Sequence, residues 1–266
     1  MKAYPTIQTR TIQLLENWRQ ELNLTNLEKY QLSRLVSSFD NQLNNLTQKN
    51  FRITAYGKSG VGKSSLLNAL IKLKVFRTDI ANGSTKEIKS FKWKKFFPEL
   101  NHVEIIDTPG IDEINSERNE KSSESIAIES DLVLFVVDSD LTTSDMDAIR
   151  SLIEFKKPII LVLNKIDQWE ASDLIALKES IKIRLRKNKI NINFTTSASS
   201  PRKAIRTNKG LIRSIKCSPQ IGFLLDTIND LISNHGELFL SMNTLFQAER
   251  LSQGIKEGRL IRRKKE

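Results

Sequence analysis

The stretch that decides the fold reads Gly57-Lys58-Ser59-Gly60-Val61-Gly62-Lys63-Ser64. It has the form G-x-x-x-x-G-K-[ST], a glycine-rich turn that ends in a lysine and a hydroxyl residue. A β-rich run over residues 51–56 precedes it, and residues 64–73 are apolar at helical spacing. A strand, a glycine turn and a helix in this order predict a loop whose N–H groups converge on phosphate oxygens.

Each residue type in this loop has a physical reason. Side chains at the glycines would keep the backbone away from the phosphates. We expect Lys63 to reach the β- and γ-phosphates and the Ser64 hydroxyl to bind Mg²⁺. The loop is therefore expected to hold a nucleoside triphosphate. The expected contacts come from Gly57, Lys58, Ser59, Gly60, Val61, Gly62, Lys63, Ser64 and Ser65.

A second motif, Asp107-Thr108-Pro109-Gly110, follows the β-rich residues 104–106. An acid at the end of a strand can hold Mg²⁺ through water, so we expect Asp107 to lie opposite Ser64. Gly110 can bring its backbone N–H close to the γ-phosphate. The tetrapeptide predicts little alone, but after a phosphate-binding loop it indicates the metal side of a triphosphate site.

A third motif, Asn164-Lys165-Ile166-Asp167, follows the apolar run over residues 159–163. The Asp167 carboxylate can accept hydrogen bonds from both N1–H and the exocyclic amino group of guanine, whereas adenine lacks this pair of donors. A base that left the carboxylate unpaired would be strongly rejected. We expect Asn164 to tie this loop to the phosphate loop and the stem of Lys165 to lie along the base.

The string Thr196-Ser197-Ala198-Ser199 follows a further β-rich run, residues 190–194. We expect the N–H of Ala198 to contact the guanine carbonyl oxygen, with Ser197 beside it. Serine- and alanine-rich turns are common, so the position after a strand and after the other motifs carries this prediction.

In this order, over residues 51–200, the motifs resemble the translation-factor-related class of P-loop GTPases, and its Era-like branch in particular. The resemblance implies an α/β fold with a mainly parallel six-stranded sheet, Mg²⁺, and hydrolysis of GTP to GDP and phosphate. It also implies a threonine that closes over the metal. Our choice is Thr85, after Gly83-Ser84, while Ser84 and Thr78 remain alternatives. The resemblance then assigns catalysis to Lys63, Thr85 and Gly110, and the metal to Ser64, Thr85 and Asp107.

One position departs from the Ras-like pattern, which has a water-orienting glutamine directly after the glycine of the second motif. Ile111 stands there, as an apolar residue does in many Era-like members. Some relatives hold a potassium ion with an asparagine in the phosphate loop, and Gly60 occupies that position. Asp112, Glu113, a partner or a second copy remain as replacements. We therefore expect slow hydrolysis that a partner or self-association accelerates.

The remaining pattern predicts helices on both faces of the sheet. Short apolar runs alternate with helical stretches, which is typical of a parallel sheet. Further strands are expected over residues 91–96 and 132–137, and further helices over residues 143–154 and 172–186.

The chain divides by pattern into three parts. Residues 1–50 are expected to form a helical hairpin, with a capping box from Thr25 to Glu28. Residues 51–235 are expected to form the GTPase domain, with a basic surface loop over residues 201–217. Residues 236–266 form a basic helical extension. Residues 220–266, through the string at residues 243–251, resemble a connecting helix of bacterial Era-like GTPases. In those proteins the chain continues into a membrane-associated hydrophobic domain of unknown function. The sequence stops before such a segment, so we expect either a short member of that group or a truncated chain.

Composition narrows the kinds of partner and the compartment that the chain suits. The formal net charge is +11 and the pI is about 9.7, which suits an anionic partner. A single cysteine, Cys217, excludes an internal disulfide framework and fits a reducing compartment, so we expect a cytoplasmic protein. No apolar run approaches the roughly 20 residues of a membrane-spanning helix.

Two hypotheses follow for the partner. The first is a switch that acts near an anionic membrane surface, through the basic loop and the basic C-terminal tail. The second is an RNA- or ribosome-associated assembly factor, which the charge suits although no RNA-binding module is recognisable. A homodimer is a further expectation.

Overall fold

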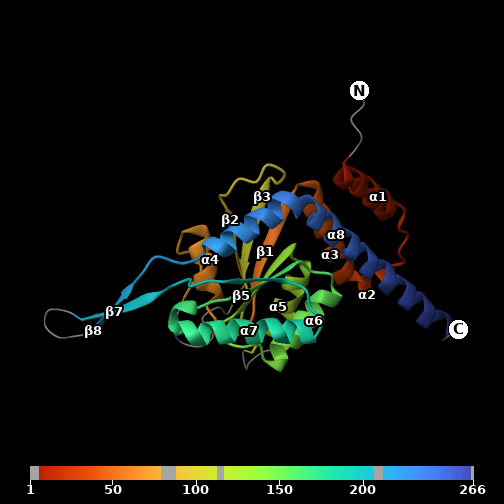
Figure 1. Cartoon of the computed structure of the whole chain (residues 1–266). Helices are drawn as coiled ribbons and strands as arrows, with labels where there is room; N and C mark the ends of the chain where they lie inside the picture. The colour runs from red at the N-terminus through yellow and green to blue at the C-terminus, as the bar shows by residue number, and fades with distance from the viewer. Residues whose placement is uncertain (1–5, 79–87, 113–116, 207–211, 265–266) are drawn as a thin grey trace. The chain divides into compact units, whose positions relative to one another are not determined.

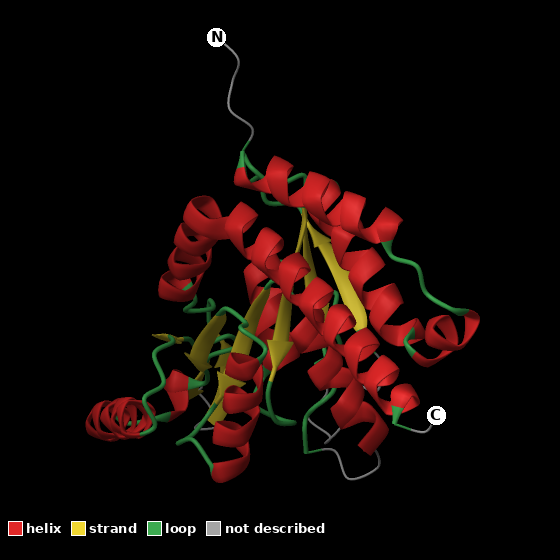
Figure 2. Ribbon diagram, turned by 90° about the vertical axis from the view of Figure 1, so that its right-hand side faces the viewer, coloured by secondary structure: helices red, strands yellow, loops and turns green. Residues whose placement is uncertain are grey.

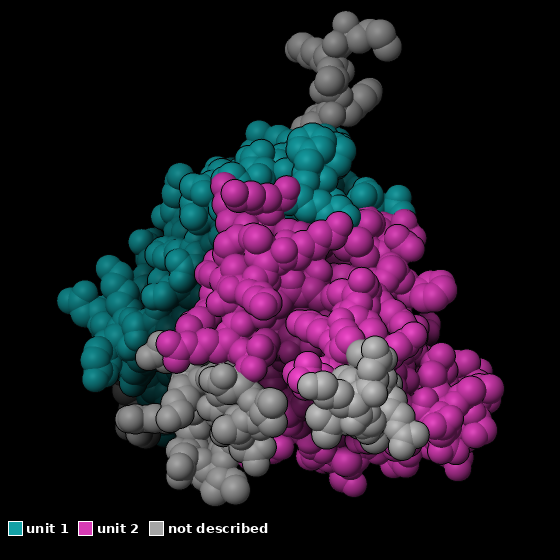
Figure 3. Space-filling model, turned by 90° about the vertical axis from the view of Figure 1, so that its left-hand side faces the viewer, with its two compact units in different colours: residues 1–51, 95–103, 232–266 teal, residues 52–94, 104–231 magenta. Residues whose placement is uncertain are grey.

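The computed structural model divides into two compact units, drawn in teal and magenta in Figure 3. Unit 1 comprises residues 1–51, 95–103 and 232–266, and unit 2 comprises residues 52–94 and 104–231. The residues that the structure describes are 6–78, 88–112, 117–206 and 212–264. Among them, no helix has both the length and the apolar character that crossing a bilayer requires.

A six-stranded sheet runs through unit 2, and its strands are yellow in Figure 2. The parallel pairs β1–β4, β4–β5 and β5–β6 give the sheet its mainly parallel character, as the motif order predicts. In spatial order the strands are β2 (Lys89–Trp93), β3 (His102–Asp107), β1 (Asn50–Tyr56), β4 (Leu132–Val137), β5 (Ile159–Leu163) and β6 (Asn193–Thr196).

The central strands are buried on both faces, because every residue of β4 and β5 is buried. Such uninterrupted apolar strands are typical of parallel sheets with helices on both sides. Alternate residues of β4 and β5 form one core cluster with apolar side chains of α5, α6 and α7. The helices of unit 2 are α4 (Lys63–Ile71), α5 (Glu117–Glu129), α6 (Thr143–Glu154), the short 3₁₀ helix η1 (Ile166–Gln168) and α7 (Ala171–Lys187).

The largest correction to the sequence prediction concerns residues 201–217, which we expected to form a surface loop. They contain two antiparallel strands, β7 (Arg202–Arg206) and β8 (Ile212–Lys216), which pair only with each other. Figure 1 shows this two-stranded ribbon extending away from the six-stranded sheet. Charged residues and flanking prolines favour a loop, and the residues show no apolar–polar alternation of period two that would indicate a strand.

Two smaller differences have similar causes. The last strand of the sheet lies at Asn193–Thr196, a few residues after the expected run. Helix α5 was not predicted, because its sequence is rich in Glu and Ser and has little apolar periodicity.

Unit 1 is helical and joins the two ends of the chain. Where residues 1–50 were expected to form a hairpin, the described residues 6–50 contain three helices, and α8 continues without a break across the boundary expected at residue 235. The helices are α1 (Ile7–Glu21), α2 (Asn26–Gln31), α3 (Ser33–Thr47) and α8 (Gly222–Arg263), the last of which enters unit 1 at Ile232.

The core of unit 1 comes from residues distant in sequence. Leu15 of α1 and Phe39 of α3 pack with Leu251 and Ile255 of α8. The ring of Trp18 meets Phe39 edge-on at 5.3 Å between centroids. Burial of these apolar side chains stabilises the association of the N-terminal helices with the last part of α8.

The predicted capping box is confirmed at the start of α2. The Thr25 hydroxyl accepts from the N–H of Glu28, and the Thr25 N–H donates to Glu28 Oε2 at 2.8 Å. The other carboxylate oxygen accepts from Arg259 Nε of α8 at 2.9 Å. The bond from Arg259, followed by the bond from the Thr25 backbone, lowers the pKa of Glu28 from 4.5 to about 2.

This lowered pKa predicts a pH dependence. Because the folded-state pKa of Glu28 lies below its unfolded value, the stabilisation is fully present above pH 4.5 and is lost as pH falls toward 2. Glu28→Gln should lower the free energy of unfolding by about 1 kcal/mol at pH 7, since Arg259 is half exposed. Urea unfolding at a series of pH values should show wild type and variant converging at low pH. A constant difference would contradict this explanation.

Candidate nucleotide-binding site

The phosphate-binding loop connects the end of β1 to the start of α4, as its sequence predicts. Gly57, Gly60 and Gly62 have positive φ, the region that favours glycine. At Gly62 a Cβ atom would also lie 2.5 Å from the Asn164 side-chain nitrogen. The loop conformation therefore depends on glycine for both backbone and packing reasons.

The ammonium group of Lys63 is held inside the loop. Lys63 is 6% exposed, and its Nζ donates to the carbonyl oxygens of Gly57 at 2.9 Å and Lys58 at 2.7 Å. These bonds fix a positive charge beside the converging backbone amides. A pre-positioned cation of this kind suits the phosphates of a nucleotide.

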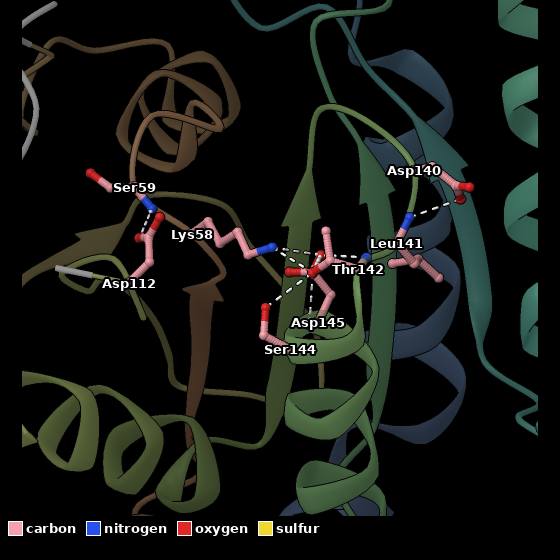
Figure 4. A network of polar contacts seen from close by, with 8 residues as sticks. All are labelled: Lys58, Ser59, Asp112, Asp140, Leu141, Thr142, Ser144 and Asp145. Atoms are coloured by element: carbon pink, nitrogen blue, oxygen red, sulfur yellow. Dashed lines mark hydrogen bonds and ion pairs between the residues drawn. The ribbon is translucent and has the colours of Figure 1, made fainter. Parts of the chain in front are cut away.

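One amide of the loop already donates to an anionic group. The N–H of Ser59 donates to Oδ1 of Asp112 at 2.6 Å, as Figure 4 shows. Asp112 is one of the residues we expected could replace the missing glutamine, and the structure places it directly on the loop. Glu113, the other such residue, lies outside the described residues.

The side chain of Lys58 points away from the loop toward α6. Its Nζ donates to Thr142 Oγ1 at 2.5 Å and to Asp145 Oδ2 at 3.1 Å, within the capping box of α6 (Figure 4). This link was not predicted, although the sequence Thr142-x-x-Asp145 carries the capping signal. Lys58 can therefore contribute its backbone to a phosphate while its side chain anchors the loop.

Two hard oxygen donors lie together where we expected the metal. The Ser64 hydroxyl donates to Asp107 Oδ2 at 2.6 Å, and both residues are buried. Hydroxyl and carboxylate oxygens are the ligands that Mg²⁺ prefers, so this pair fits the expected ion. Thr85, expected to close over the metal, and its alternative Ser84 lie outside the described residues. The other alternative, Thr78, lies within them.

Gly110 packs directly against the phosphate-binding loop. A Cβ atom at Gly110 would lie 2.5 Å from the backbone nitrogen of Ser59 and 2.7 Å from its Cα. The next residue, Ile111, donates its N–H to the Gly57 carbonyl at 3.3 Å, and its side chain packs on the core of unit 2. Ile111 is thus a packing residue, and the backbone of residues 110–111 lies along the loop.

The close packing of Gly110 against the Ser59 backbone predicts the effect of Gly110→Ala. The added methyl group meets rigid backbone, so residues 110–112 should be displaced from the loop and GTP turnover should fall at least about 10-fold. Single-turnover hydrolysis should measure this loss. Gly222→Ala is the matched control, because no atom lies within 4 Å of a Cβ there. Equal activity of the two variants would contradict the role of this contact.

Asn164 joins three motifs through one buried side chain. Its Nδ2 donates to the Val61 carbonyl at 3.0 Å, which confirms the predicted tie to the phosphate-binding loop. Its Oδ1 accepts from the Ser197 hydroxyl at 3.0 Å and from the N–H of Ser199 at 3.1 Å. The segments expected to bind phosphate and base are therefore connected at a fully buried amide.

The part of the third motif that we expected to select the base is exposed. Asp167 lies in the 3₁₀ helix η1, and its carboxylate faces solvent. Lys165 has a positive φ of 58°, and its Nζ forms an ion pair with Asp138 Oδ2 at 2.7 Å. Asp138 directly follows β4 and was not predicted, because the pairing depends on two neighbouring strand ends.

The backbone of Ala198, which we expected to contact the base, pairs with Gln220 in this structure. Its N–H donates to the Gln220 carbonyl at 2.9 Å, and its carbonyl accepts from the N–H of Gln220 at 2.9 Å. A contact from the Ala198 N–H to a guanine carbonyl would require this bridge to open. Gln220 carries no motif signal, so only the tertiary structure reveals the bridge.

The sheet order, the glycine loop with its buried lysine and the Ser64–Asp107 pair define a P-loop GTPase domain with the Era-like α/β fold. Residues 52–165 match the family described as 50S ribosome-binding GTPase. Over 119 residues the chain is 38% identical to the GTPase Der of Helicobacter hepaticus, covering 43% of this chain and 24% of Der. The chain thus spans about a quarter of the length of that relative.

Solved structures share the fold. A variant of Era from Aquifex aeolicus, bound to GDP and AlF₄⁻, superposes with a TM-score of 0.52 at 24% identity, covering 68% of this chain and 56% of Era. Era in complex with MgGDPNP and nucleotides 1506–1542 of 16S ribosomal RNA superposes with a TM-score of 0.51 at 25% identity. That match covers 69% of this chain and 57% of Era.

Proposed function

We propose that this protein binds GTP with Mg²⁺, hydrolyses it to GDP and phosphate, and acts as a nucleotide-dependent switch. The observation that carries the proposal is the buried Asn164 side chain, which connects the phosphate-binding loop to the Ser197–Ser199 loop. Three separate motifs of the sequence meet at this amide. A single site for phosphate and base explains the convergence.

The roles of the residues follow from their positions. Lys63 and the amides of residues 57–64 would hold the phosphates, and Ser64 with Asp107 would hold Mg²⁺, with Thr85 as the proposed closing ligand. The metal would neutralise charge on the β- and γ-phosphates. Asp167 would select guanine, with Lys165 beside the base. Ser65, Ser197 and, after its bridge opens, Ala198 complete the proposed contacts.

Hydrolysis is proposed to be slow in the isolated protein. No glutamine follows Gly110, and the side chain of Ile111 packs on the core of unit 2. Asp112 is already on the phosphate-binding loop, where it could position water only after leaving the Ser59 amide. A partner or a second copy would then supply the missing group.

For the partner we favour RNA over a membrane. The matched family is described as ribosome-binding, and one structural neighbour holds ribosomal RNA. The membrane hypothesis rests on the basic segments and on the resemblance of residues 243–251 alone. We place the switch in the cytoplasm. Ribosome co-sedimentation at moderate salt, run beside flotation with anionic liposomes, separates the two partners.

GTP turnover by the purified protein, measured with Mg²⁺ over a wide concentration range, tests the proposal. Lys63→Ala gives the background from contaminating enzymes. Turnover per molecule that rises steeply with concentration supports activation by self-association. Flat, slow turnover with tight GTP binding supports an absent partner. Fast turnover by dilute monomer overturns the slow-switch proposal, and absence of GTP binding overturns all of it.

A further inference from the structure

The β7–β8 ribbon carries a dense positive charge that neither the fold nor the nucleotide site uses. Residues 201–217 contain basic residues and no acidic one. Four of the basic residues have described side chains, and all four are exposed: Arg202, Lys203, Arg213 and Lys216. Within the described part of the chain, none of the four forms an ion pair or hydrogen bond through its side chain.

The register of the ribbon places like charges opposite each other. Arg202 pairs directly with Lys216, so both side chains stand on the same face. Like charges at opposed positions of an antiparallel pair are destabilising, and an isolated two-stranded ribbon is only marginally stable. A bound anion at this face would remove the repulsion, so the register favours an anionic ligand.

The opposite face carries two further basic residues, each of which pairs with an isoleucine. Lys203 pairs with Ile215 and Arg213 pairs with Ile205, and these positions alternate with Arg202 and Lys216 along the strands. A planar lipid surface can touch only one face of a ribbon, and an element that inserts into lipid needs an apolar face. A ribbon that is charged on both faces suits a ligand with phosphates on both sides.

We propose that the β7–β8 ribbon is an arm that inserts between phosphate backbones of a folded RNA. Groove-like sites where two strands approach each other present phosphates on both sides of an inserted element. The four basic side chains contact phosphate groups and not the edges of nucleobases. Binding should therefore depend on RNA shape and salt more than on sequence. The inference deepens the proposed function and rests on its RNA partner, but not on GTP hydrolysis.

The root of the ribbon is attached to the rest of unit 2 by backbone hydrogen bonds. The N–H of Cys217 donates to the Pro201 carbonyl at 2.8 Å, which closes the ribbon. Beyond it, Gln220 forms the bridge to Ala198 of the proposed base-binding loop. An RNA held by the arm would therefore pull on a segment that is bonded to the nucleotide site.

The test replaces all four basic residues with glutamine in the full chain: Arg202→Gln, Lys203→Gln, Arg213→Gln and Lys216→Gln. The matched control removes the same charge from α7: Lys178→Gln, Lys182→Gln, Arg186→Gln and Lys187→Gln. The probes are a fluorescent RNA stem-loop with an internal bulge, duplex DNA of the same length, and vesicles containing phosphatidylglycerol. Affinity is measured by anisotropy over a range of about 50 to 300 mM salt, and vesicle binding by flotation.

We expect the ribbon variant to bind the RNA about 100-fold more weakly at about 0.1 M salt, with a log–log salt slope smaller by about 3. The α7 control should change affinity less than about 3-fold. Equal losses in both variants, equal binding of DNA, or binding to vesicles but not to RNA would each overturn the proposal. Thermal melting and GTP binding are measured on the same samples. If the wild-type protein does not bind GTP, the proposed function is refuted, while the RNA result remains valid.

Discussion

Asp167→Asn is expected to exchange the preferred base of the nucleotide from guanine to xanthine. The carboxylate faces solvent in η1 and can accept two hydrogen bonds from the guanine edge. Two bonds to a charged group contribute about 1.5–3 kcal/mol each, so GTP affinity should fall about 1,000-fold. The asparagine amide can instead donate to the additional carbonyl of xanthine, and XTP affinity should rise by a similar factor.

Competition of GTP and XTP against a fluorescent guanine nucleotide measures both changes. Asp173→Asn, the same chemical change in the first turn of α7, serves as the control and should alter neither affinity more than about 2-fold. If Asp167→Asn binds GTP as wild type does, the third motif does not read the base. The nucleotide assignment would then rest on the phosphate-binding loop alone.

Lys63→Ala should remove most of the affinity for GTP. The ammonium group is the fixed positive charge at the centre of the loop, and its two carbonyl partners hold it there before any ligand binds. Several charge-assisted hydrogen bonds to phosphate oxygens would be lost at once, so we expect at least about a 1,000-fold rise in the dissociation constant. The loss should be larger for GTP than for GMP, because Lys63 is expected to contact the β- and γ-phosphates.

Isothermal titration with GTP and GMP measures this difference. Lys187→Ala, at the exposed end of α7, is the charge-matched control and should bind both as wild type does. Because Lys63 is buried, circular dichroism and thermal melting must first establish that the variant folds. A folded variant with unchanged GTP affinity would refute the role of Lys63.

The candidate site was largely predictable because its motifs are local. The phosphate-binding loop, the metal-side acid and the Asn164 tie each depend on a few consecutive residues at the end of a strand. In a parallel sheet the carboxyl ends of the strands share one edge, so the motif order was enough to bring these residues together. The capping box at Thr25 followed from residues within one helical turn for the same reason.

Other features depend on pairs of residues far apart in the chain. The Ala198–Gln220 bridge, the Asp112 carboxylate on the Ser59 amide, and the Lys58 contact with α6 have no local signature. In the ribbon, β7 and β8 pair although neither segment has an apolar–polar alternation of period two, and the prediction of a loop there was wrong. These contacts form only when segments that are separate in sequence meet in the folded chain.

The amino-acid sequence by itself determined the α/β class, the phosphate-binding loop and the motifs that indicate guanine, because backbone conformation and residue chemistry specify them within short segments. The tertiary structure decided which of those groups are already engaged. It packed Ile111 on the core, joined Ala198 to Gln220, packed the two ends of the chain into unit 1, and set Arg202 opposite Lys216. Strand register and side-chain packing are properties of the whole fold, and no short segment encodes them.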